Sequence, residues 1–473
     1  MPARLLAAFL ALAAAPAAAS AAAPQYRLRY DSRDETMSVR LCLSEAAARM
    51  HFSADEGASN FIENLAREHA PALARDDDGW SAADWKAGEC LSYRAALGRI
   101  ADAGRENGGA RRGTDLVVDP ALWLLRADDS GGAEAELTLP SGYSISAPWH
   151  PQVSAGDARR FTIPDTPEDW MARIAIGRFA EAPIALAGGT LRFSILSGAD
   201  AAERSKLATW IAHVSRATLS AYGKLPLADV QVLMLPVAGE HDPVVFGQST
   251  RGQGHALTLF VDPTESADAF DRDWVAVHEL SHLFHPYLGD RGSWLAEGLA
   301  TYYQNVLRAR GGLLTPQRAW EQIDAGFARG RGAMRKNAIG LESASASSGQ
   351  DHAFMRIYWS GTAYWLEVDA ELRRSSGNTL SIDEALRRFD ECCLPSYRKW
   401  EPADFVARLD ALLGTDVFTR RFREYRQRRD FPDLASLYSD LGIHRDGESL
   451  RFDDGARAAD VRRAIMSAPS PAR

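Results

Sequence analysis

Two histidines four residues apart, His278 and His282, constrain this chain more than any other feature of its sequence. The surrounding segment, Val-Ala-Val-His-Glu-Leu-Ser-His-Leu-Phe-His-Pro, has the apolar spacing of a helix that ends at Pro286. Residues four apart lie one turn apart on the same helical face, so both imidazole rings can reach one metal ion at about 2.0 to 2.1 Å. Glu279 follows the first histidine, where its carboxylate can accept a proton from water at the open position of such an ion. The spacing therefore predicts a helical metal site with its own general base.

A His-Glu-x-x-His pattern can also arise on an ordinary helix with surface histidines, since the chain has 11 of them. The downstream segment Ser-Trp-Leu-Ala-Glu-Gly-Leu-Ala-Thr-Tyr-Tyr places Glu297 near the start of a second helix, and a tight reversal can bring it to the two histidines. His285 is the alternative third ligand. At 1.5 Å per residue it lies about 10 Å from His278 along the helix axis, too far for one ion. We therefore expect Glu297 to be the third ligand and His285 to cap the end of the helix.

The combination of His-Glu-x-x-His with Trp-Leu-x-Glu-Gly-x-Ala-x-Tyr resembles the gluzincin metallopeptidases, most closely the glycyl aminopeptidase family and more distantly the aminopeptidase N family. The resemblance implies a thermolysin-like catalytic domain with one zinc ion held by His278, His282 and Glu297. It also implies hydrolysis of peptide bonds by attack of zinc-bound water, assisted by Glu279. The segment Tyr-Trp-Ser-Gly is similar to the Tyr-x-x-Gly segment of both families, which assigns to Tyr358 the hydrogen bond to the tetrahedral intermediate. The alternative for Tyr358 is an aromatic core residue.

Two departures from the family pattern bear on specificity and on metal binding. Aminopeptidase relatives carry a Gly-x-Met-Glu-Asn-like segment on a strand before the zinc helix, and its glutamate binds the free α-amine of the substrate. The corresponding segment here, residues 252–259, has no glutamate, although as a strand it can still pair with the substrate backbone. Many gluzincins also carry an acidic residue four positions after the glutamate ligand, where this chain has Thr301, which can orient an imidazole less strongly. The choice between aminopeptidase and endopeptidase therefore stays open.

The rest of the sequence predicts an α+β multidomain protein, because 473 residues are too many for one compact core. Short strands such as 26–30 and 38–43 alternate polar and apolar residues, with helical and polar stretches between 44 and 136. A glycine-rich loop joins the expected strands at 230–235 and 257–261. We expect a β-rich N-terminal domain at 22–175, a thermolysin-like catalytic domain at 176–310, a helical C-terminal domain at 311–461, and a flexible tail at 462–473.

The first 21 residues have the layout of a secretory signal peptide. They contain an arginine, a run of Leu, Ala and Phe interrupted by Pro16, and a final Ala-Ser-Ala. This predicts cleavage before Ala22, a periplasmic or secreted location, and no stable membrane insertion after cleavage. An uncleaved anchor is the alternative, but the stretch is mostly alanine and barely long enough to span a bilayer.

Export would expose the four cysteines to an oxidising compartment. We expect a bridge between Cys42 and Cys90, which lie in the same predicted domain. Cys392 and Cys393 are adjacent, so a bond between them requires strained geometry, and the alternative is two buried thiols.

Charge narrows the choice of partners. A formal net charge of -9 argues against general nucleic-acid binding, which needs a surplus of Lys and Arg. The expected partner is a peptide or protein substrate, and the sequence does not define an oligomeric state. The rival from another class is a catalytically silent zinc-site protein that acts in binding or assembly in the periplasm. A purely structural zinc site would not need a base at Glu279, which favours an enzyme.

Overall fold

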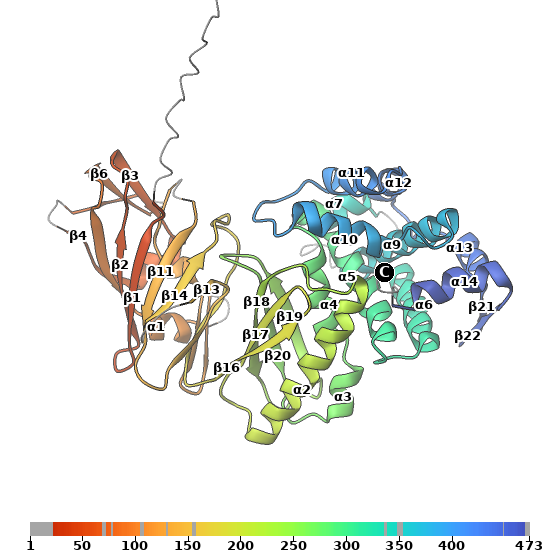
Figure 1. Ribbon diagram of the computed structural model, residues 1–473, viewed down its shortest axis with the longest axis horizontal. Helices are drawn as coiled ribbons and strands as arrows, with labels where there is room; N and C mark the ends of the chain where they lie inside the picture. Colours follow the sequence, from red (N-terminus) through yellow and green to blue (C-terminus); the bar gives the residue numbers. More distant parts are fainter. Residues whose placement is uncertain are drawn as a thin grey trace, which may run out of the picture.

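A computed structural model describes residues 22–68, 72–76, 79–104, 108–128, 131–153, 158–334, 338–347, 353–447 and 449–468. The expected signal peptide at 1–21 and residues 469–473 of the expected tail lie outside these ranges. The chain passes from a β-rich N-terminal lobe through a mixed sheet to a helical C-terminal part (Figure 1). This is the α+β multidomain architecture that the sequence predicts. Within the described ranges, no helix is long and apolar enough to cross a lipid bilayer.

Three sheets build the N-terminal lobe. Strand β1 shows why the sequence favours strands here: every second residue is buried, including Tyr26, Leu28 and Tyr30. In spatial order, the seven-stranded sheet contains β13 (His150–Gln152), β14 (Arg159–Ile163), β11 (Ala133–Thr138), β1 (Gln25–Asp31), β2 (Thr36–Cys42), β7 (Cys90–Ala95) and β4 (Ile62–Arg67). The two four-stranded sheets contain β10 (Arg126–Ala127), β3 (Ala47–Ser53), β6 (Gly79–Trp85) and β5 (Ala74–Asp76), and β12 (Ser144–Ser146), β15 (Ile174–Gly177), β9 (Asp115–Val118) and β8 (Gly109–Arg112).

The expectation of helical stretches between residues 44 and 136 is wrong for most of that region. Strands dominate it, and α1 (Leu97–Asp102) is the one α-helix among its described residues; η1 (Glu56–Asn60) and η3 (Pro120–Leu122) are 3-10 turns. Several of these strands do not bury alternate residues, as in β3 and β6, so they lack the period-two pattern that reveals a strand in sequence.

A five-stranded sheet supports the predicted metal helix. Its strands, in spatial order, are β16 (Glu181–Leu186), β17 (Gly189–Ile195), β18 (Asp229–Pro236), β20 (Ala256–Val261) and β19 (Val244–Thr250). The three central strands run parallel, and both edge strands run antiparallel to their neighbours. Strand β19 lies in the segment predicted to be a loop. Its Val245 and Phe246 are both exposed and Gly247 follows, so its sequence shows no alternation.

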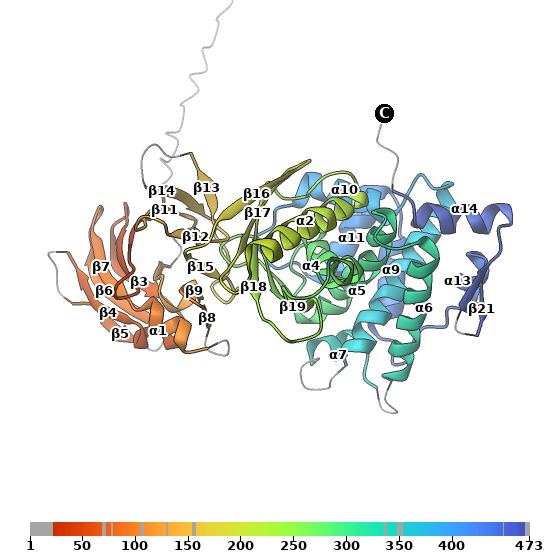
Figure 2. The same cartoon turned by 90° about the horizontal axis from the view of Figure 1, so that it is seen from below.

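Helices cover this sheet and form the C-terminal part of the chain (Figure 2). They are α2 (Ala201–Thr218), α3 (Ala267–Arg272), α4 (Val275–Ser281), α5 (Ser293–Arg310), α6 (Pro316–Gly332), α7 (Leu341–Ala346), α9 (Phe354–Ser376), α10 (Ile382–Cys393), α11 (Pro402–Leu413), α12 (Val417–Arg426), α13 (Ala435–Asp440) and α14 (Ala456–Ile465). Short 3-10 turns join some of them: η4 (Leu219–Ala221), η5 (His282–Phe284) and η6 (Asp290–Gly292). A small hairpin of β21 (Ile443–Asp446) and β22 (Ser449–Phe452) precedes α14, which continues into the segment expected to be a flexible tail.

Helices α5 and α9 cross at two glycines. A Cβ atom on Gly298 would lie 2.4 Å from the Cα of Gly361, and one on Gly361 would lie 1.9 Å from the carbonyl oxygen of Trp294. Both distances are far below van der Waals contact, so only glycine lets the two backbones approach this closely. The crossing brings α9 against the helix that carries Glu297.

One hydrophobic core joins the five-stranded sheet to the C-terminal helices, and a second fills the N-terminal lobe. A smaller cluster connects the lobe to the sheet, with Val117 and Ala175 of the lobe packed against Leu233 and Phe260. The metal helices therefore lie inside a continuous packed core rather than on a mobile surface segment.

All four cysteines form disulfides. Cys42 and Cys90 pair across the adjacent strands β2 and β7, which confirms the expected bridge. Cys392 bonds to Cys393 at the end of α10, and Cys392 is exposed, so the alternative of two buried thiols is wrong.

Candidate metal centre

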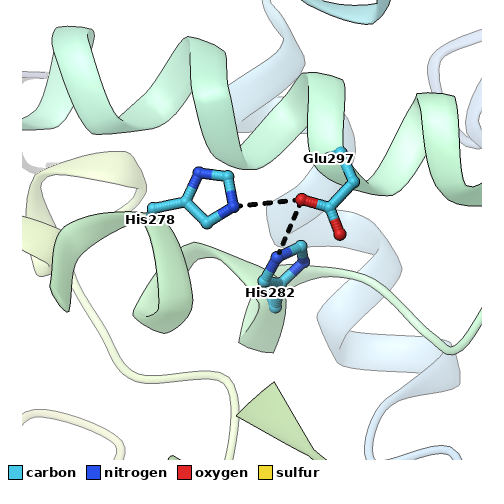
Figure 3. A group of neighbouring side chains, drawn as sticks. All are labelled: His278, His282 and Glu297. Carbon is cyan, nitrogen blue, oxygen red and sulfur yellow. Dashed lines mark hydrogen bonds and ion pairs between the residues drawn. The ribbon is translucent and has the colours of Figure 1, made fainter. Parts of the chain in front are cut away.

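Three predicted ligands converge between α4 and α5. Glu297 Oε2 lies 3.1 Å from His278 Nε2 and 3.6 Å from His282 Nε2 (Figure 3). One ligand atom from each residue lies within 4.8 Å of the others. Atoms bonded to one zinc ion at about 2.0 to 2.1 Å in tetrahedral geometry are about 3.3 Å apart. The spacing of this trio thus fits a single ion of that size.

The helix that carries the histidines is shorter than its sequence predicts. Asp273 Oδ1 accepts a hydrogen bond from the backbone N–H of Val275 at 2.7 Å, and α4 ends at Ser281 before the 3-10 turn η5. His285 is extended, with φ -141° and ψ 158°, because the proline that follows it disfavours helical geometry. The ring of His285 therefore leaves the helix and turns back toward His282.

Neighbouring groups fix the orientation of both histidine rings. His278 Nδ1 lies 2.9 Å from Gln304 Oε1, which can only accept, so in the neutral ring Nδ1 carries the hydrogen and Nε2 can offer a lone pair. His285 Nδ1 donates to the Pro286 carbonyl at 2.7 Å, which leaves His285 Nε2 as an acceptor. His282 Nδ1 donates to that atom at 3.1 Å. Each ring therefore directs Nε2 toward Glu297.

The directions of the pKa shifts of His285 and Glu297 in the metal-free protein agree with this arrangement. Burial lowers the pKa of His285 well below its usual value, and the nearby Arg251 acts in the same direction, so the ring stays neutral and can accept. Burial opposes the ionisation of Glu297, but the charge of His282 and the hydrogen bond from His278 hold its pKa well below the usual range. A carboxylate and two imidazole nitrogens that converge in a buried place need a proton or a cation between them. The donor set thus fits zinc, which binds imidazole and carboxylate.

Glu279 follows His278 on α4, and its carboxylate interacts electrostatically with all three members of the trio. It is buried, and the backbone N–H of Ser249 in β19 donates to its carboxylate. Burial raises the pKa of Glu279, while the charges of His282 and His278 lower it in part. Gly247 makes room for this side chain, since a Cβ there would lie 2.7 Å from Glu279 Cγ.

Tyr358 reaches the same place from α9. Its ring stacks on His278 with centroids 5.9 Å apart, and its hydroxyl hydrogen-bonds to Glu297. Burial, with the charges of Glu297 and Glu279, raises the pKa of the phenol well above its usual value, so it stays protonated. The structure therefore brings together all five residues that the sequence analysis selected.

Comparison with solved structures identifies the fold. The chain superposes on an aminopeptidase N family protein from Idiomarina loihiensis with a TM-score of 0.68 and 12% identity, covering 89% of this chain and 78% of the other. It also superposes on an M1 zinc metallopeptidase from Deinococcus radiodurans with a TM-score of 0.54 and 14% identity, covering 87% and 94%. The chain has the fold of the M1 zinc metallopeptidases. Yeast LTA4 hydrolase in complex with bestatin is similar too, with a TM-score of 0.55 and 12% identity over 89% of this chain and 70% of that one. No protein-family model and no curated protein sequence matches the chain.

Within this M1-type fold, two expectations about neighbouring residues are wrong. Thr301 does not orient a histidine, because its hydroxyl is buried and has no hydrogen-bond partner among the residues that the structure describes; Gln304, farther along α5, has that role. His285 stands at the C-cap position of η5, but its ring does not bond to the last carbonyls of the helix, because the ring nitrogens bond to His282 and to the Pro286 carbonyl. The backbone carbonyls of His282 and His285 instead accept from Arg251, which the sequence analysis did not select.

The strand edge that is free to pair with a substrate backbone is not the one that the sequence predicts. Residues 252–259 include most of β20, which is buried and hydrogen-bonded to strands on both sides, so it offers no free edge. The free edge beside Glu279 belongs to β19, at residues 244–250. Neither segment contains a glutamate or an aspartate.

Proposed function

We propose that this chain is a zinc-dependent peptidase that hydrolyses bonds in peptides or proteins. The observation that carries the proposal is the position of Glu279, a buried carboxylate held by a backbone N–H beside three converging metal-binding atoms. A zinc site that only stabilised the fold would have no use for this fourth group. The Deinococcus radiodurans neighbour was solved as a variant bound to a Tyr-Ser-Ala substrate, which supports peptides as the substrate class.

Glu279, Tyr358 and strand β19 each have a separate role in the proposed hydrolysis. A bound zinc ion supplies a Lewis acid for the scissile carbonyl and makes water more acidic. Glu279 takes the proton from the attacking water and passes it to the leaving amine, a role suited to a carboxylate whose pKa is raised by burial. Tyr358 donates a hydrogen bond from its hydroxyl to the carbonyl oxygen as negative charge develops there. The free edge of β19 holds the substrate backbone in an extended conformation.

Replacing Glu279 by glutamine tests the proposal. The Glu279→Gln variant keeps the size and the hydrogen-bond acceptor of the side chain but cannot take a proton, so it should bind zinc as the natural protein does and lose hydrolysis. Metal content by mass spectrometry and cleavage of a peptide library measure the two properties separately. Glu240→Gln is the matched control, because Glu240 is exposed on the loop before β19 and should leave both properties unchanged.

The outcomes separate the two classes of function. Undiminished turnover by Glu279→Gln would refute the catalytic role of this residue. Zinc-loaded natural protein that cleaves no peptide in the library would favour the rival, a silent zinc-site protein that acts in binding or assembly.

We also propose that the protein works outside the cytoplasm, in the periplasm or as a secreted protein. Two observations support this: the signal-like sequence of residues 1–21 and the presence of every cysteine in a disulfide. Mass spectrometry of the protein recovered from its cells should give a mature N-terminus at Ala22. An intact N-terminus in the cytoplasmic fraction would contradict export.

A further inference from the structure

Arg251 is a cation anchored to the backbone of the segment that carries His282 and His285. It follows the last residue of the edge strand β19, and its Nη2 donates to the carbonyl oxygens of His282 at 2.7 Å and His285 at 3.3 Å. These two carbonyls belong to a proposed ligand and to the residue that orients it. The guanidinium thus occupies a fixed place within the site.

Helix capping accounts for only part of this side chain. A guanidinium carries five N–H donors, and the two hydrogens on Nη2 serve the two carbonyls. Among the residues that the structure describes, Arg251 forms no ion pair, and its Nε and Nη1 have no hydrogen-bond partner. The side chain is partly buried, where an unpaired charge is costly. Three donors on a fixed fork therefore remain available for a planar anion such as a carboxylate.

The charges around the site favour an anionic ligand. The carboxylates that act on Arg251 are those of Glu297 and Glu279, and both already have roles in the proposed chemistry. With a divalent ion in place, those two negative charges and the positive charge of Arg251 leave the centre with one net positive charge. Residues 244–255, which form the edge strand and the turn after it, contain no acidic residue that could receive an ammonium group.

The position of Arg251 along the edge strand β19 determines how far it lies from the bond that is cleaved. Ser249 contacts Glu279 through its backbone, and Arg251 lies two residues farther along. Two residues of extended chain span about 7 Å. A peptide paired with β19 therefore carries the group that faces Arg251 within about two residues of its scissile bond.

We propose that Arg251 binds a carboxylate of the peptide substrate within two residues of the cleaved bond, and that the site selects acidic peptides over peptides that present a free N-terminal ammonium there. The carboxylate can belong to an aspartate or glutamate side chain or to the C-terminus of a short peptide. This inference rests on the proposed peptidase function and adds the substrate class to it.

Matched peptide pairs test the inference without any change to the protein. Peptides cleaved by the zinc-loaded protein are remade with Asp or Glu replaced by Asn or Gln, with the C-terminal acid replaced by an amide, and with the free N-terminus acetylated. Loss of the recognised carboxylate should lower kcat/KM about ten- to hundredfold, the size expected for a charge-assisted hydrogen bond. The first two substitutions tell which carboxylate is bound, and acetylation should leave cleavage unchanged or improve it.

Variants of Arg251 then link the effect to this residue. In Arg251→Gln the difference between acidic and neutral peptides should fall to less than threefold, whereas Arg251→Lys should retain part of it because the charge remains. Arg29→Gln, at an exposed arginine of β1, is the matched control and should behave as the natural protein does. Zinc content and the thermal midpoint of each variant show whether the centre itself is intact.

Each outcome decides between the two proposals. Peptide cleavage that ignores the carboxylate, or an acid preference that persists in Arg251→Gln, would overturn the role of Arg251 and leave the peptidase proposal standing. If the zinc-loaded protein cleaves nothing, the peptidase proposal fails, and calorimetry with the same peptide pairs still tests Arg251. Equal affinities for the acidic and amide forms would then overturn it.

Discussion

Replacing His285 tests how the metal centre is held together. In the structure His285 Nε2 accepts the hydrogen from His282 Nδ1 at 3.1 Å, inside a packed environment where His285 itself is 3% exposed. Phenylalanine at this position fills nearly the same space but offers no acceptor, so His285→Phe leaves the N–H of His282 unpaired and buried. An unsatisfied buried group costs about 1 to 3 kcal/mol. Since about 1.4 kcal/mol corresponds to a tenfold change in an equilibrium constant, zinc should bind about ten- to hundredfold more weakly.

The assay is a competition titration of zinc against a chromophoric chelator, carried out on the natural protein and three variants. His285→Gln carries an amide oxygen that can accept from His282, so it should recover most of the lost affinity. His213→Ala, which removes a histidine from the surface of α2, should change nothing. Equal zinc affinity in His285→Phe and the natural protein would refute the reasoning, as would equal losses in the phenylalanine and glutamine variants, which would indicate a packing role alone.

Two further changes have defined expectations. Tyr358→Phe removes the hydroxyl that contacts Glu297, so steady-state kinetics should show kcat lowered about 100- to 1,000-fold with KM and zinc content nearly unchanged; a kcat within a few-fold of the natural value would assign Tyr358 to the core instead. The double variant Cys42→Ala/Cys90→Ala opens a bridge between residues separated by 48 positions. Loop-closure entropy for that length predicts that the unfolding free energy falls by about 4 kcal/mol, measured by denaturant titration under oxidising conditions. An unchanged denaturation midpoint would show that the lobe does not depend on this bridge.

The metal trio could be predicted because local geometry decides most of it. The i, i+4 spacing of His278 and His282 places both side chains on the same face of any helix. Glu297 follows closely enough in sequence for a short reversal of the chain to bring it back to the two histidines. The groups that orient the rings depend on tertiary detail. His285 reaches His282 only because the helix loosens into a 3-10 turn and the residue before Pro286 becomes extended. Pro286 is the sequence signal that could have predicted this extended residue, because the residue before a proline disfavours helical geometry.

The edge strand was harder to find from sequence. Val245 and Phe246 are both exposed, and the chain then continues with a glycine and three polar residues, which is the composition of a loop. Its strand conformation is imposed by pairing with the buried strand β20 rather than by its own residues. For the same reason Arg251 carried no sequence signal: its importance comes from where β19 ends relative to the metal helix.

The contact between Gly298 and Gly361 limits how this protein can change. Gly298 follows Glu297 directly, and Gly361 lies one helical turn beyond Tyr358, so a single backbone contact holds the proposed ligand and the proposed hydrogen-bond donor in register. A methyl group added at either glycine would push α5 and α9 apart and move both groups at once. Mutations intended to change specificity can therefore be made along β19 and at Arg251. Substitution of either glycine would instead disrupt the catalytic geometry and abolish activity whatever the substrate.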